Sequence, residues 1–225
     1  MPGRIVIGMK KKYILTIAAL VLGSNTYAST ITFVGADATR GGTINLSWMG
    51  VAANDYAGYI DITVDGTYSR FAFCADIGTG ISNTTYNTLI RSPSTITNGL
   101  RAAWLVENYM AAATTVTAGE AMQIAIWDII HDGGNGFSAG NLRSTASTPA
   151  AVLTAANQYL TLSLGKSSSN AIIYNNTQVS NGVAGQTLIG RVPNDGGPGT
   201  PEPATLLVTG AGLILLGVIG RRKLS

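Results

Sequence analysis

The apolar residues of this chain change their spacing in the middle of its length, and this change limits the folds open to it. Between residues 56 and 74 hydrophobic and polar side chains alternate, as where Ile60 and Ile62 flank Asp61, which predicts half-buried strands. Between residues 98 and 162 apolar side chains recur every three or four positions, which predicts helices. We therefore expect an α+β fold: a β-sheet or sandwich subdomain with a central helical subdomain.

The predicted strands lie on both sides of this helical part. Asp65-Gly66 is a hairpin turn signal between two of them. Strands are expected at residues 30–34, 42–48, 56–64, 68–74, 171–174 and 186–192.

Three predicted helices occupy the middle of the chain. The first follows Asn98 as a cap, and the second opens at a capping box that joins Thr117 to Glu120. The third follows Thr148-Pro149, since proline is favoured in a first helical turn.

The first 28 residues have the pattern of a secretory signal peptide. Lys10, Lys11 and Lys12 precede an apolar run at 13–22, and small residues lead up to Ala28. We expect translation to start at Met9 and cleavage to follow Ala28, so that the chain is exported.

The last 25 residues form a second targeting pattern. Pro201-Glu202-Pro203 precedes an uncharged stretch at 204–220 that is long enough for a transmembrane helix, and Arg221 and Arg222 follow it. A basic end is retained in the cytoplasm. Residues 194–200 are rich in Gly and Pro and are expected to form a flexible linker.

This ending resembles the PEP-CTERM sorting signal of Gram-negative bacteria that secrete exopolysaccharide. The resemblance covers residues 201–225 and implies processing by an exosortase. It further implies an inner-membrane intermediate and a final place at the cell surface or in the extracellular biofilm matrix.

Composition excludes several other classes of protein. Residues 29–200 carry seven basic and ten acidic side chains, a net charge of −3, so the basic pI of the whole chain indicates no nucleic-acid partner. The chain has one Cys and one His. It can form no internal disulfide and no cysteine- or histidine-built metal site, and we expect no cofactor.

The single cysteine belongs to a notable pair of segments. Phe73-Cys74 ends a predicted strand, and Gln123 lies within a predicted helix. Trp127 follows Gln123 by four residues and shares its helix face, so a polar amide is expected on an otherwise apolar stripe.

Phe73-Cys74 and the run from Gln123 to Trp127 resemble the Cys-Gln thioester (TQXA-like) domains of bacterial surface adhesins. The resemblance implies a domain over residues 29–193 with a thioester between Cys74 and Gln123. Such a domain captures one amine or hydroxyl nucleophile on a surface protein or polysaccharide and does not turn over. Phe73 and Trp127 are expected to shield the thioester from water.

Two alternatives remain open at this point. The domain could be a non-covalent structural protein of the exopolysaccharide matrix with a free Cys74. It could also be a cysteine hydrolase in which His131 serves Cys74 as general base, although His131 is expected to point away from the face that carries Gln123.

Overall fold

The computed structural model describes residues 27–179 and 185–192. The linker at 194–200, the sorting signal at 201–225 with its helix at 204–220, and the signal peptide up to residue 26 lie outside the described residues. The elements are β1 (Tyr27–Trp48), β2 (Val51–Val64), β3 (Tyr68–Cys74), β4 (Thr85–Arg91), α1 (Gly99–Tyr109), α2 (Val116–Asp132), β5 (Leu142–Ser144), α3 (Ala150–Leu162), β6 (Ala171–Val179) and β7 (Leu188–Arg191).

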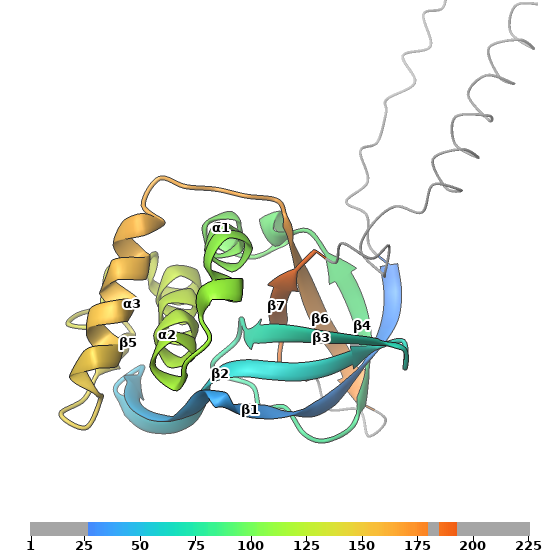
Figure 1. Cartoon of the computed structure of the whole chain (residues 1–225), viewed down its shortest axis with the longest axis horizontal. Coiled ribbons are helices and arrows are strands. Elements are labelled where there is room, and N and C mark those ends of the chain that lie inside the picture. The colour runs from blue at the N-terminus through green and yellow to red at the C-terminus, as the bar shows by residue number, and fades with distance from the viewer. Residues whose placement is uncertain (1–26, 180–184, 193–225) are drawn as a thin grey trace, which may run out of the picture.

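The described strands form one antiparallel sheet that closes on itself. The order is β2-β3-β7-β6-β4-β1-β5, and β1 pairs with β2 as well. Ile31 of β1 shows the closure, because it faces Tyr86 of β4 on one side and Val64 of β2 on the other. The result is a small barrel, with β5 added to the far half of β1 (Figure 1).

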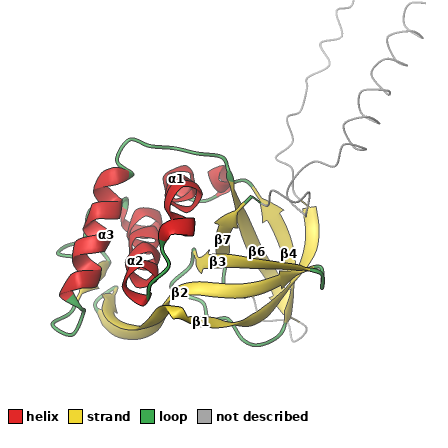
Figure 2. Cartoon of the chain, in the orientation of Figure 1, coloured by secondary structure: helices red, strands yellow, loops and turns green. Residues whose placement is uncertain are grey.

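The three helices gather at one end of this barrel (Figure 2). Helix α2 lies at the centre of the group, and every residue from Gly119 to Ile130 is buried. A helix that is apolar on nearly all sides belongs inside a fold. Gly119 permits its close approach to the sheet, since a Cβ at this position would lie 1.8 Å from the carbonyl oxygen of Arg40 in β1.

The α+β prediction is confirmed, with a large antiparallel sheet and three helices. The strands expected at 30–34 and 42–48 are two parts of β1, which runs through the segment between them with irregular pairing. Strand β4 is absent from the predicted elements. Its inward positions include Thr88 beside Tyr86 and Ile90, so its apolar alternation is too weak to recognise.

The helices lie where they are expected, but their caps differ. Thr115, not Thr117, caps α2, accepting a hydrogen bond from the N–H of Ala118. Asn98 precedes α1 in a left-handed conformation and makes no side-chain cap bond. Pro149 is itself the cap residue of α3. Within the described residues, no helix has the length and apolar character needed to cross a membrane.

Asp128 on α2 gives the fold a pH dependence. Its side chain is fully buried, one of its oxygens has no hydrogen-bond partner among the described residues, and burial raises the pKa of the carboxyl to about 6. The folded state therefore holds this proton more tightly than the unfolded chain, whose Asp has its ordinary pKa near about 4. Stability contributed by this group is full below the lower value and is lost as pH rises through the higher one.

We expect the free energy of unfolding to fall by up to about 3 kcal/mol between about pH 4 and pH 7 because of Asp128. Asp128→Asn removes the titration, so its unfolding free energy should decline less over the same range in urea titrations. Equal slopes for the two proteins would contradict this assignment.

Candidate functional site

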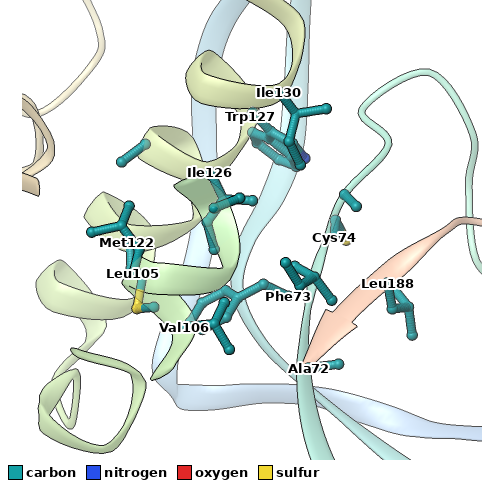
Figure 3. Close-up of a cluster of buried hydrophobic side chains, with 14 of the residues drawn as sticks. Ala72, Phe73, Cys74, Leu105, Val106, Met122, Ile126, Trp127, Ile130 and Leu188 are labelled. Atoms are coloured by element: carbon teal, nitrogen blue, oxygen red, sulfur yellow. The ribbon is translucent and has the colours of Figure 1, made fainter. Parts of the chain in front are cut away.

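The single cysteine lies at the end of β3, where three elements meet. Cys74 pairs with Leu188 of β7, and the next residue extends the pairing, since the N–H of Ala75 donates to the carbonyl oxygen of Thr187. Its side chain is 3% exposed. Figure 3 shows Cys74 between Leu188 on β7 and Trp127 on α2.

Gln123 of α2 binds the backbone of Cys74 and is itself fully buried. Its Oε1 accepts from the N–H of Cys74 at 2.9 Å, and its Nε2 donates to the carbonyl oxygen of Cys74 at 2.8 Å. The carboxamide thus makes the two backbone hydrogen bonds to Cys74 that a neighbouring strand would make. The structure places the two residues in contact through the cysteine backbone, and the bond between Gln123 and the sulfur stays a prediction.

A second carboxamide, that of Gln186, lies against the sulfur. Sγ of Cys74 donates to Oε1 of Gln186 at 2.8 Å, and Nε2 of Gln186 donates to the carbonyl oxygen of Asp76 at 2.7 Å. Because a C=O bond is about 1.2 Å long, the carbonyl carbon of Gln186 is at most about 4 Å from the sulfur. This is close to the separation of roughly 3–3.5 Å from which bonds form.

Buried polar groups of the barrel support Gln186 from behind. Nδ2 of Asn176 on β6 donates to the carbonyl oxygen of Gln186, and Thr88 on β4 donates to Oδ1 of Asn176. Gly185 has no room for a side chain, since a Cβ would lie 2.3 Å from the ring of Tyr86. The backbone that carries Gln186 is therefore held on more than one side.

Cys74 is among the residues that line a cavity of about 410 Å³. Cys74, Gln186 and Trp127 line one part of it, and Asp55 and Tyr56 of β2 line another. Residues 77–81 complete the wall, and the exposed backbone of Gly78 and Gly80 lies at the rim. The buried Cys74-Gln186 pair and the exposed Gly78 and Gly80 therefore line one and the same cavity.

The electrostatics of the cavity keep the sulfur neutral. Burial raises the pKa of the Cys74 thiol well above its usual range, and the charges of Asp76 and Asp55 act in the same direction. A free Cys74 is therefore a thiol at neutral pH and a poor metal ligand. The described residues contain no group of three or more His, Cys, Asp or Glu side chains that could hold a metal ion.

The two predicted shielding residues have different positions. Trp127 is 1% exposed and lines the cavity beside Cys74. Phe73 is fully buried and packs against Tyr59, with ring centroids 4.7 Å apart, and it is not among the cavity residues. Successive side chains of a strand point to opposite faces, so the neighbour of Cys74 belongs to the core.

His131 bonds the backbone of Ala75, the residue after Cys74, and does not line the cavity that contains Cys74. Its ring packs edge-on against Trp48 at 4.9 Å, and it lines a separate cavity of about 370 Å³ that contains Asp76 but not Cys74. Burial lowers the pKa of its imidazole. No hydrogen bond joins His131 to Cys74 within the described part of the chain.

Gln186 is the site residue that the sequence motifs do not reveal. It begins the predicted strand at 186–192, but nothing local marks it as different from other polar residues at strand ends. Its approach to Cys74 depends on the pairing of β3 with β7 across 112 residues. What marks Gln186 is its burial next to Gly185, a position with no room for a side chain. Both features are visible only in the structure.

No protein-family model matches this chain, and searches of curated proteins and of solved structures find no match either.

Proposed function

We propose that this chain is an exported covalent adhesin whose Cys74 forms an internal thioester with a glutamine side chain. The observation that carries the proposal is the buried contact between Sγ of Cys74 and Oε1 of Gln186, which are 2.8 Å apart and belong to residues that line a cavity with an exposed rim. An electrophile in such a cavity is protected from bulk water yet can be reached by a nucleophile on a partner.

Gln186 is the better acyl donor of the two glutamines. Both carboxamides use their oxygen and their nitrogen in hydrogen bonds, but that of Gln123 is directed entirely at the backbone of Cys74. Gln186 presents its carbonyl group to the sulfur instead. In this proposal Gln123 holds Cys74 in place, whereas the resemblance to thioester domains assigns the acyl group to Gln123.

The chemistry balances without a cofactor. Sγ attacks the carbonyl carbon of Gln186, a C–S bond forms, and the C–N bond breaks. The thiol proton leaves with the nitrogen as ammonia, so no external base is consumed. The thioester carbonyl is then open to attack by an amine or hydroxyl, which forms an amide or ester on residue 186 and returns Cys74 as a thiol.

Mass spectrometry of the purified domain tests this proposal. We expect the native domain to be lighter than its sequence by one ammonia. Methylamine should leave N-methylglutamine at residue 186 and a free thiol at Cys74. Gln186→Glu has the same shape but no leaving group, so it should show the full mass, as should Cys74→Ala.

The outcomes separate the alternatives. N-methylglutamine at residue 123 would show that Gln123 forms the thioester, and covalent capture would still be supported. Full mass with a freely alkylated Cys74 would remove the thioester and favour a non-covalent matrix protein. Turnover of an ester or peptide that is lost in Cys74→Ala would favour a hydrolase.

The two ends of the chain are the basis for proposing where the domain acts. We propose that the domain is exported, processed by an exosortase at the 201–225 signal and presented at the cell surface or in the exopolysaccharide matrix, where it would mediate adhesion within a biofilm. Its partner would be a surface protein or polysaccharide bearing an amine or hydroxyl. Ala28, the expected cleavage position, is only the second residue of β1, so cleavage there leaves the barrel strand almost whole.

A further inference from the structure

The cavity over Cys74 contains one acid that the proposed capture chemistry has not used. Among the described residues that line it, Asp55 alone is charged at neutral pH. Asp55 is half-buried on β2, where its backbone pairs with β1, and its carboxylate has no hydrogen bond or ion pair with any other described residue. An ionised carboxylate accepts hydrogen bonds at both oxygens, so this one has capacity for a ligand.

Asp55 and the sulfur are near enough to influence one another. Both line the same cavity, and the negative charge of Asp55 contributes to the raised pKa of Cys74. Burial in turn raises the pKa of the Asp55 carboxyl. A carboxylate with a raised pKa is a better proton acceptor than one in water.

We propose that Asp55 selects a protonated primary amine as the nucleophile and accepts its proton, which deepens and rests on the proposed thioester function. An ammonium group entering the cavity meets a single negative charge and, within the described lining, no positive one. A neutral hydroxyl gains far less from that charge. The cavity therefore favours amines over the hydroxyl groups that dominate a polysaccharide matrix.

Asp55 and the departing sulfur together accept both protons that the amine loses. The ammonium gives one proton to Asp55, and the free amine then attacks the carbonyl carbon of residue 186. The C–S bond breaks as the amide forms. The sulfur, whose thiolate is disfavoured here by burial and by Asp76, takes up the second amine proton and leaves as a thiol. Asp55 later releases its proton to water.

The test uses Asp55→Asn in a domain that carries the thioester. We expect the variant to keep the mass lighter by one ammonia, because Asp55 takes no part in forming the bond. Its reaction with methylamine at neutral pH should slow by at least about tenfold, a conservative share of what a positioned base supplies. Hydroxylamine, which is mostly uncharged at this pH, should react at nearly the native rate. Asp55→Glu should recover part of the methylamine rate.

Asp61→Asn is the matched control, since Asp61 lies on the same strand and does not line the cavity. It should leave both rates unchanged. Equal loss with the two nucleophiles, or no loss with methylamine, would overturn the role of Asp55 while the thioester stands. A native domain with no mass deficit would instead contradict the thioester itself.

Two amine sources can supply this chemistry, the side chain of lysine and an amino sugar. Nα-acetyl-lysine and glucosamine, offered separately, distinguish them by which one is captured in an Asp55-dependent way. Capture of neither, by a domain that reacts with methylamine, would contradict selection of a macromolecular amine. The domain has a single lysine between residues 29 and 200, Lys166, so Lys166→Arg provides a version that cannot capture its own lysine.

Discussion

Replacing Trp127 by alanine is expected to lower the free energy of unfolding by about 3–5 kcal/mol, the usual cost of deleting a buried tryptophan side chain. The ring is 1% exposed and lies between α2 and the strand that ends at Cys74. Its removal also opens the cavity wall beside the sulfur. Urea titration measures the first effect, and the rate at which water restores the full mass measures the second.

A loss of this size can unfold a domain whose total stability is about 5–15 kcal/mol. Trp127→Phe is the milder companion and should keep the fold while its thioester hydrolyses faster than the native one. The control is Trp104→Ala on α1, where the ring is only partly buried and lies outside the cavity. If Trp104→Ala exposed the thioester as much as Trp127→Phe does, the shielding role of Trp127 would be refuted.

Replacing Gln123 by leucine is expected to cost about 2–5 kcal/mol of unfolding free energy. Leucine has a similar shape, so little volume is lost. The N–H and the carbonyl oxygen of Cys74 both lose their hydrogen-bond partner in a buried place, and each unsatisfied group costs about 1–3 kcal/mol. Thermal or urea unfolding of the purified variant measures the loss.

Gln158→Leu supplies the comparison, because Gln158 lies on α3 with its side chain exposed. That substitution should change stability by less than about 0.5 kcal/mol. A similar small effect for Gln123→Leu would mean that the bonds to Cys74 do not hold helix and strand together.

Local patterns in the sequence identify much of the fold. Alternation around Ile60 predicts β2 and β3, and the apolar stripe with Gln123 and Trp127 predicts α2. These signals lie within a few residues of one another, so periodicity alone can detect them. The sequence also pairs Gln123 with Cys74; the structure shows them in contact through the cysteine backbone, and the predicted thioester bond stays a prediction.

The pairing of strands that are distant in the chain cannot be predicted from local sequence patterns. Gln186 reaches the sulfur because β7 lies between β3 and β6, and no local pattern encodes that order. The same limit explains Phe73: adjacency to Cys74 in the chain places it on the opposite face of β3, against Tyr59. The capping box at Thr117 fails for a simpler reason, since Thr115 caps the helix two residues earlier and both positions carry the same residue type.

The place of Gln186 near the end of the barrel has a mechanical consequence. A target joined to its side chain, in a protein retained through the segment after residue 192, pulls along residues 186–192 alone. Tension then bypasses β1, the helices and most of the hydrophobic core. A bond at Gln123 would instead load α2 and every strand that follows it. In the proposed function, with the acyl group on Gln186, attachment would outlast forces that pull the rest of the domain apart.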